Sequence, residues 1–378
     1  MLEAMIELYP WDLRDEGADA VLDRLQGEVG LTGIVLWAAT PPVLQIRRRP
    51  VEPRVFRTRG GVGYPSDESH YSATRLAPPV ADWVREEDML AEVCEACARR
   101  GLGIRFVVSA DTVGGNRDVP SDMVTTNAFG SESRAHLCLL NPDGQGYLQA
   151  LIEELYARFA FSCLELADFG SRWGEVEAVE MPGSGEASSI ARFLLGVCWC
   201  DSCMEQARRD GVDAESARGA MAHGLDRYFG QPSLGDAALR PLLSDDGPVG
   251  RYLQWQSCRF QAWFERLEGR VPRRILVRRE AVHAVAGELT HCGRIADAKS
   301  VRVDAAAWDA EETVGGGSDV HVPASVLEVR EADQVVAHFS RLAEAGVVCI
   351  TAGNYGRMAP KTLVGIRQAV RFARRIAS

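Results

Sequence analysis

The order of apolar and amphipathic segments predicts an α/β protein of the (β/α)8 barrel class, as a single domain over residues 1–378. Three observations favour this class. Eight short apolar segments recur along the chain, and helical patterns separate most of them, as expected for parallel strands joined by crossover helices. Long segments follow several predicted strands, whereas turns from helix to strand, such as Arg100–Gly103, are short. No GxGxxG motif follows the first strand, which disfavours the rival fold, an open doubly wound sheet.

The predicted strands are short runs rich in aliphatic and aromatic residues. They are expected at Met5–Tyr9, Gly33–Ala38, Ile104–Ser109, Cys163–Ala167, Arg274–Val277, Val301–Ala305, within Val320–Val329, and at Val347–Thr351. The long segments that follow strands cover residues 39–87, 110–142, 168–197 and 306–319. In a barrel these segments lie on the carboxyl face, where active sites form.

The predicted helices carry apolar residues at spacings of three and four, and several end at a stop signal such as Gly101. They are expected at Asp19–Val29, Asp88–Arg100, Gly146–Arg158, Ser202–Arg209, Glu215–Tyr228, Val249–Leu267, Gln334–Ala345 and Pro360–Ala377.

Composition and charge exclude several classes of function. With 42 basic and 53 acidic side chains, the net charge of −11 repels a polyphosphate, so we expect no nucleic-acid partner. No apolar stretch approaches the roughly 20 residues that span a bilayer, and Met1–Leu13 lacks the features of a signal peptide. We therefore expect a cytoplasmic protein with no membrane partner. The absence of GxSxG, P-loop and HExxH motifs disfavours serine hydrolases, nucleotide-binding proteins and zinc proteases.

Three cysteines form a CxCxxC run at Cys198, Cys200 and Cys203. Three thiols within six residues can converge on one ion, and zinc prefers four ligands in a tetrahedron. The best fourth ligand is Cys138, which lies in an earlier strand-to-helix segment. Four cysteines leave no open coordination position, so the predicted zinc is structural. The alternatives are unrelated thiols, or a redox pair at Cys200 and Cys203.

The segment with Cys138, a carboxylate on the fourth predicted strand and the CxCxxC run together resemble the zinc-bearing β-galactosidases of glycoside hydrolase family 42, over roughly residues 127–211. That resemblance implies that the four cysteines bind zinc beside an active site, and that the protein is a homo-oligomer. The chain is also similar to a group of uncharacterised, glycosidase-like TIM-barrel proteins. These have sequence motifs like those at Leu164–Leu166, Gly196–Cys200 and Asn354–Gly356. The second resemblance is the closer one, and it implies no particular activity.

Two glutamates are the expected catalytic pair. Retaining glycosidases use two carboxylates about 5 to 5.5 Å apart, and in the sugar-cleaving barrels that the chain resembles these come from strands four and seven. Glu165 lies in the otherwise apolar fourth strand, where a glutamate is costly to bury unless it lines a site or is paired. We expect Glu165 to be the acid/base and Glu328, on strand seven, to be the nucleophile. The alternative for Glu165 is an ion-paired structural glutamate inside the barrel.

The chain departs from the sugar-cleaving enzymes at one position, because they have asparagine before the strand-four glutamate and this chain has Leu164. That difference leaves a different reaction open.

Polar and aromatic residues near other strand ends are expected to bind the substrate. Aromatic rings suit the apolar face of a sugar, a histidine can carry a proton, and Asp168 is the second choice for the acid/base after Glu165. The expected binding residues are Glu7, Tyr9, Trp37, His70, Asp111, Asp168, Asn354 and Tyr355.

The sequence therefore predicts a glycoside-hydrolase-like enzyme that acts on a carbohydrate or glycosylated small molecule through paired carboxylates. One alternative is an isomerase, lyase or non-glycosidic hydrolase on the same barrel, including one that serves small-molecule biosynthesis. Another is a non-catalytic sugar-binding barrel.

Overall fold

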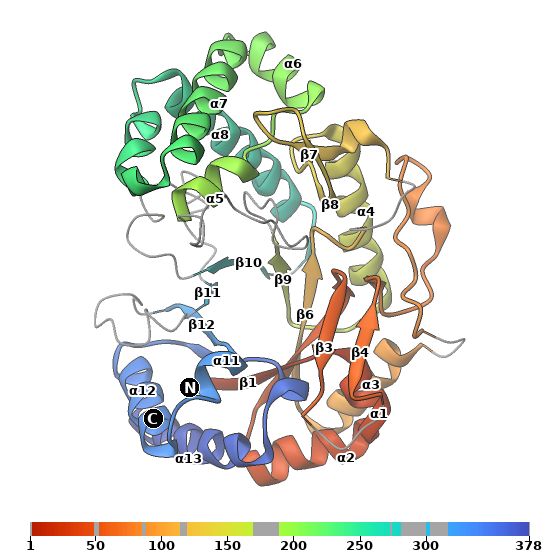
Figure 1. The fold of residues 1–378 in the computed structure, drawn as a ribbon. Coiled ribbons are helices and arrows are strands. Elements are labelled where there is room, and N and C mark those ends of the chain that lie inside the picture. Colours follow the sequence, from red (N-terminus) through yellow and green to blue (C-terminus); the bar gives the residue numbers. More distant parts are fainter. Residues whose placement is uncertain are drawn as a thin grey trace.

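The computed structural model describes residues 2–48, 53–84, 88–113, 119–168, 189–272, 274–280, 300–302 and 317–377. It is a mixed α/β structure in which helices surround a curled parallel sheet (Figure 1). Within the described ranges, no helix is both long and apolar enough to cross a membrane.

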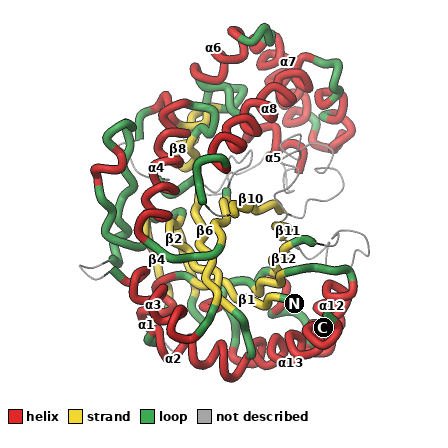
Figure 2. Tube along the Cα trace, turned by 180° about the vertical axis from the view of Figure 1, so that it is seen from behind, coloured by secondary structure: helices red, strands yellow, loops and turns green. Residues whose placement is uncertain are grey.

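Among the described residues, the curled sheet contains eight parallel strands, and neighbouring parallel strands follow the order of the chain. They are β1 (Glu3–Leu8), β2 (Gly33–Thr40), β6 (Gly103–Ser109), β9 (Cys163–Ala167), β10 (Arg274–Glu280), β11 (Ser300–Arg302), β12 (Asp319–Val322) and β13 (Cys349–Ala352). The first strand pairs in parallel with both β2 and β13, so the pairings run around a common interior (Figure 2). Each predicted strand coincides with one of these, although residues 303–305 of the sixth lie outside the described residues.

The long helices agree with the predicted ones to within a few residues at most ends. They are α3 (Met89–Arg100), α4 (Pro142–Arg158), α6 (Asp201–Arg209), α7 (Ala214–Gly230), α8 (Pro248–Glu268), α12 (Ala332–Glu344) and α13 (Pro360–Ile376). The predicted helix at Asp19–Val29 is instead α2 (Ala18–Asp23) followed by a π-helical turn, η1 (Arg24–Val29).

Short elements lie in the segments after the strands and, for η4 and η5, between α7 and α8. The short helices are α1 (Pro10–Glu16), α5 (Ser189–Gly196), α11 (Ala324–Leu327) and the 3-10 turns η2 (Glu68–Tyr71), η3 (Ser121–Met123), η4 (Pro232–Ala238), η5 (Arg240–Leu243) and η7 (Tyr355–Arg357). Two antiparallel hairpins, β3 (Val43–Ile46) with β4 (Val55–Thr58) and β7 (Val124–Thr126) with β8 (Glu132–Leu137), also lie there. A short strand, β5 (Gly61–Val62), pairs with the end of β2.

The strands have two different faces, because successive side chains of a strand point to opposite sides. The residues facing the helices, such as Ile34 and Leu36 of β2, belong to the main hydrophobic core. The alternate residues form a separate small apolar cluster inside the sheet, which includes Val35, Trp37 and Val107. The buried charged residues Glu7, Arg105, Glu165 and Asp319 also alternate with residues of the main core, so polar groups share the interior with this second set.

The segment after β5 is attached to the outer helix α4 through one buried carboxylate. Glu154 accepts hydrogen bonds from Tyr64 Oη at 3.0 Å and Tyr71 Oη at 2.7 Å. It also accepts from Ser66 Oγ at 3.1 Å and from the backbone N–H of Asp67 at 2.8 Å. Residues 64–71 are therefore held against α4 by a side chain with no exposed surface.

Candidate active site

An ion-pair network lies inside the sheet. The Nε of Arg278, on β10, donates to Glu165 Oε2 at 2.8 Å, and its Nη1 donates to Glu7 Oε2 at 2.6 Å. His321 Nε2, from β12, lies 3.1 Å from Glu7 Oε2. Arg105 Nη1, from β6, lies 3.9 Å from Glu165 Oε1. Glu165 is only 2% exposed, so its carboxylate faces arginines and not solvent.

The pair formed by Glu7 and Arg278 is held in its ionised form. Burial raises the pKa of Glu7, but the charges of Arg278 and His321 outweigh burial, so this pKa lies well below its usual range. Burial likewise lowers the pKa of Arg278, and the charges of Glu7 and Glu165 raise it above its usual value. These groups make a rigid charged floor, which agrees with the alternative interpretation of Glu165 as an ion-paired glutamate.

Asp168 is the carboxylate at the carboxyl end of the fourth strand of the curled sheet. It immediately follows β9, is partly exposed, and has a φ of 65°, the one positive φ of a non-glycine residue in the described ranges. Ser109 Oγ, at the end of β6, donates to Asp168 Oδ2 at 2.5 Å. A strained backbone that a neighbouring strand supports is typical of functional sites.

The hydroxyl of Ser109 has only one possible direction for its hydrogen. Ser109 Oγ accepts from the backbone N–H of Asp111 at 3.0 Å, so its single hydrogen is left for Asp168. The side chain of Asp111 bonds His136 Nδ1 at 2.8 Å, which ties the end of β6 to the hairpin strand β8. Asp111, a predicted binding residue, therefore supports Asp168 from behind.

Tyr9 lies among the aromatic residues of the site. Its ring stacks on Trp11 at 4.2 Å and lies 5.6 Å from the ring of Trp37. Burial raises the pKa of Tyr9, and the nearby charges of Glu7 and Asp168 raise it further, so the phenol keeps its proton. Tyr9 and Trp37 thus lie together beside Glu7, and the expectation that these three residues bind the substrate stays a prediction.

Asn354 follows β13 and belongs to a chain of buried hydrogen bonds. Trp11 Nε1 donates to Gln45 Oε1 at 2.8 Å, and Gln45 Nε2 donates to Asn354 Oδ1 at 3.4 Å. Because Trp11 also stacks on Tyr9, this chain places Asn354 in the same group of side chains as the predicted residue Tyr9.

The placement of Glu328 on strand seven is wrong. The seventh strand ends at Val322, and Pro323 begins a short helix, α11, whose last residue is followed by Glu328. The Glu328 carboxylate accepts from the backbone N–H of Ala359 at 2.7 Å and from Thr362 Oγ1 at 2.6 Å. It therefore stabilises the start of α13, and no contact brings it together with Glu165 in the described part of the structure.

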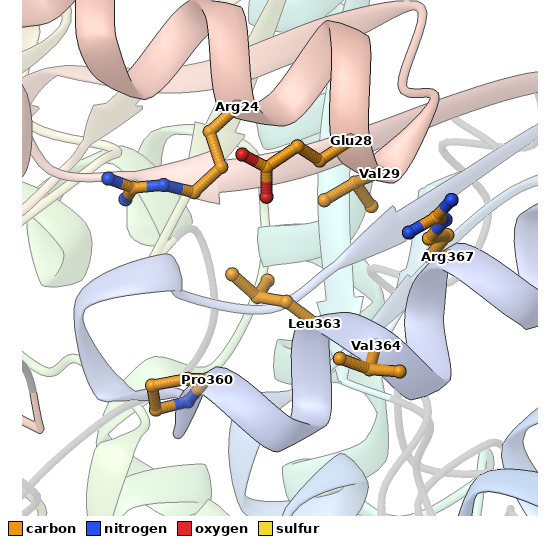
Figure 3. A pocket seen from close by; sticks show the side chains of 7 residues that line it. All are labelled: Arg24, Glu28, Val29, Pro360, Leu363, Val364 and Arg367. Atoms are coloured by element: carbon orange, nitrogen blue, oxygen red, sulfur yellow. The ribbon is translucent and has the colours of Figure 1, made fainter.

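His70 and Tyr355 also lie apart from this group. His70 is exposed on η2, which packs against the outer helix α4. The hydroxyl of Tyr355 bonds Arg24 and Glu16, on the side of the π-helical turn η1. Arg24 also lines a surface groove between η1 and α13 with a volume of about 300 Å³ (Figure 3). These contacts join neither residue to the group around Glu7, so the expectation that they bind the substrate stays a prediction.

The four predicted metal ligands converge. The sulfur atoms of Cys138, Cys198, Cys200 and Cys203 all lie within 4.8 Å of one another and are buried. Cys138 Sγ lies 3.5 Å from Cys203 Sγ and 3.6 Å from each of the other two, so none of these pairs is a disulfide. Cys138 follows β8, Cys198 and Cys200 lie between α5 and α6, and Cys203 lies in the first turn of α6, so the cluster joins two distant segments.

Four further residues of the site were not predicted from the sequence: Arg105, Arg278, His321 and His136. One signal could have identified the first three: each is a charged or polar residue inside an apolar strand, as Glu7 and Glu165 are. Such residues are expected on the interior face of the sheet. No comparable signal marks His136, because its strand was not predicted.

No protein-family model and no curated protein matches the chain. Among solved structures, the chain is similar to α-L-fucosidase isoenzyme 2 from Paenibacillus thiaminolyticus, with a TM-score of 0.56 and 11% sequence identity over 98% of this chain and 49% of that one. It is also similar to the PgaB (BpsB) glycoside hydrolase domain from Bordetella bronchiseptica, with a TM-score of 0.51 and 12% identity over 100% of this chain and 99% of that one. The chain spans about half the length of the fucosidase. At these identities the comparisons establish one conclusion, that this chain has a fold similar to those of two glycoside hydrolases.

Proposed function

We propose that the protein is a glycoside-hydrolase-like enzyme on a single closed (β/α)8 barrel, acting on a carbohydrate or a glycosylated small molecule. The strand order and the pairing of β1 with both β2 and β13 support the barrel. The likeness in fold to two glycoside hydrolases supports the choice of reaction class.

The observation that carries this proposal is the position of Asp168. A carboxylate at the end of a barrel strand is where catalytic residues of this architecture lie. The hydrogen bond from Ser109 Oγ to Oδ2 orients Asp168, and we assign this carboxylate the role of nucleophile or base toward the substrate. Asp168 therefore replaces Glu165 as the proposed reacting carboxylate on the fourth strand, because the oxygens of Glu165 face Arg278 and Arg105.

The other residues of the site have supporting roles in this proposal. The ion pair of Glu7 with Arg278 fixes the floor below the substrate. Tyr9 keeps its proton and so offers an O–H donor to a substrate oxygen, beside the ring of Trp37. Glu328 has no role in the reaction, and Asp168 is the one member of the carboxylate pair that the described residues assign.

We also propose that the four cysteines bind a structural zinc ion. A zinc ion with four sulfur ligands at about 2.3 Å has sulfur–sulfur edges of about 3.8 Å. The three distances from Cys138 Sγ, 3.5, 3.6 and 3.6 Å, fit that geometry, and all four thiols are buried. Bound zinc would join the end of the β7–β8 hairpin to the start of α6 and would leave no position for a substrate.

The test is hydrolysis of a panel of aryl glycosides by the wild-type protein and by Asp168→Asn. We expect the substitution to lower turnover by about 10²- to 10⁴-fold, because it removes the reacting carboxylate, with little change in melting temperature. Asp122→Asn, which alters an exposed aspartate on η3, is the matched control and should keep its activity. Full activity of Asp168→Asn would contradict the assignment, and sugar-dependent stabilisation without any hydrolysis would favour the sugar-binding alternative.

A further inference from the structure

The hydrogen bonds of Trp11, Gln45 and Asn354 have a fixed direction. An indole N–H is only a donor, so the atom of Gln45 that faces Trp11 Nε1 at 2.8 Å must be its carbonyl oxygen. The amide nitrogen of Gln45 then points to Asn354, and the atom of Asn354 that receives it at 3.4 Å must be Oδ1. Trp11 therefore determines the orientation of both amides.

Close packing supports this arrangement. Gly356 lies against the chain of hydrogen bonds: a Cβ atom at this position would lie 2.8 Å from Gln45 Nε2 and 2.1 Å from Asp12 Oδ1. Gln45 is 4% exposed and Asn354 is 5% exposed. The hairpin strand β3 thus brings Gln45 against Asn354, 309 residues away in the chain.

The fixed direction leaves Asn354 Nδ2 as the outer end of the chain. This nitrogen has no hydrogen-bond partner in the part of the chain that the structure describes, although it is buried. A buried amide that keeps both of its N–H groups unpaired is costly, and such groups in native proteins commonly meet a ligand or ordered water.

We propose that Asn354 is a donor-only binding residue that recognises an acceptor oxygen of the substrate, either a hydroxyl or a carbonyl oxygen. The stacking of Tyr9 on Trp11 places this contact beside the aromatic part of the candidate site. A protonated amine at the same position of the ligand is rejected, because it has no lone pair to accept from Nδ2. This inference rests on the proposed function and specifies the substrate class as oxygen-bearing, and not amine-bearing, at one ring position.

The first experiment determines the orientation directly by neutron diffraction from deuterium-exchanged crystals, without ligand and soaked in D-galactose. We expect deuterium on the Gln45 nitrogen that faces Asn354, and a water or sugar oxygen at Asn354 Nδ2. A reversed amide, or a protein acceptor already bonded to Nδ2, would overturn the inference even if no sugar is bound.

The second experiment measures affinities of D-galactose derivatives by calorimetry, with hydroxyl, fluorine, hydrogen or ammonium at each ring position in turn. At one ring position we expect the fluorine derivative, which keeps a weak acceptor, to bind with an affinity about tenfold or more above that of the ammonium derivative. Gln45→Glu replaces the donor to Asn354 with an acceptor, so Asn354 should rotate to present Oδ1, and the preference should reverse toward ammonium.

Two further variants keep the test decisive. Gln26→Glu makes the same change of charge at a residue that donates to the backbone of Arg100, and it should leave the preference unchanged. If Gln45→Glu does not fold, Trp11→Phe gives the same test without a change of charge. It removes the donor that fixes the chain of hydrogen bonds, so it should weaken the preference. An unchanged preference in both Gln45→Glu and Trp11→Phe would overturn the inference.

The outcomes separate this inference from the proposed function. A sugar oxygen at Asn354 Nδ2 without hydrolysis of any aryl glycoside would remove the enzyme class and keep the inference. Hydrolysis of an aryl glycoside, together with a protein acceptor bonded to Asn354 Nδ2, would keep the enzyme class and remove the inference.

Discussion

Two buried carboxylates close together in the sequence, Glu7 and Asp12, have opposite responses to their surroundings. Glu7 faces Arg278 and has a pKa well below its usual range. Burial raises the pKa of Asp12 to about 7, and the hydrogen bond from the Tyr9 backbone and the charge of Arg47 only partly oppose this effect. In this pair of carboxylates, the direct contact with Arg278 lowers the pKa of Glu7, and burial raises the pKa of Asp12.

The raised pKa of Asp12 predicts a dependence of stability on pH. Between about pH 4 and pH 7, Asp12 keeps its proton in the folded state and loses it in the unfolded state, so its contribution to stability falls as pH rises. Asp12→Asn removes this loss, so its stability relative to wild type should increase by about 2–4 kcal/mol between pH 4 and pH 8. Urea unfolding at both pH values measures the difference, with Asp23→Asn on the surface as the control. A difference that does not change with pH would contradict the assignment.

The direction of the Ser109 hydroxyl predicts a second effect at the residue scale. Ser109→Ala removes the donor to Asp168, and a hydrogen bond to a charged group contributes about 1.5–3 kcal/mol, so kcat should fall by about 10- to 100-fold. The matched control is Thr112→Val, because Thr112 Oγ1 is equally buried in the same turn but donates to the Ser109 backbone. Equal losses of kcat in both variants would mean that the turn, and not the contact with Asp168, matters.

At the scale of elements, the insertions after the strands are attached by specific side chains and not by extensive sheets. Residues 64–71 depend on Glu154 of α4, and the β3–β4 hairpin reaches the end of β13 through Gln45. Such attachments join segments distant in sequence and position the residues of the candidate site.

The attachment through Glu154 can be tested by Glu154→Gln. The new amide nitrogen would face donors that now point at a carboxylate, so we expect a loss of about 2–4 kcal/mol of stability. Hydrogen exchange should become faster in residues 64–71 and remain unchanged in the sheet. Glu153→Gln, at the exposed neighbouring position, should change neither quantity. Unchanged exchange in residues 64–71 of Glu154→Gln would show that other contacts hold the segment.

The elements were predictable where local periodicity and tertiary packing agree. The strands were predicted because each is a short run rich in apolar residues, and most long helices because one face is buried. The two hairpins and α1 were not predicted, because they are short and their positions depend on contacts such as Trp11 with Gln45. Glu328 was misplaced because one apolar run contains both β12 and α11, and Pro323 between them is the boundary that periodicity alone does not show.

At the scale of the molecule, the cysteine cluster joins segments about 60 residues apart. The sequence predicted all four members, because the spacing of three of them and the chemistry of zinc restrict the possibilities. The charged floor was only partly predictable. Glu7 and Glu165 were recognised as acidic residues in apolar strands. Their partner Arg278 is positioned by the pairing of β10 with β9, which no local sequence pattern encodes.

The cluster predicts about one zinc ion per chain after growth with zinc and desalting. Cys138→Ser should lower the zinc content several-fold and make the β7–β8 hairpin more susceptible to limited proteolysis. Cys258→Ser is the matched control, because Cys258 is exposed on α8 and should not affect the metal. Wild-type protein without any bound metal would contradict the proposal.

The position of β1 between β2 and β13 has a consequence for biosynthesis. About 340 residues separate β1 from its second neighbour, and translation at about 5–20 residues per second delivers that neighbour roughly 17–70 s later. One edge of the nascent first strand therefore stays without its native partner on the ribosome for that time. Because such a long-range pairing also slows spontaneous folding, we expect refolding from denaturant to be slow and to depend on keeping this edge from aggregating.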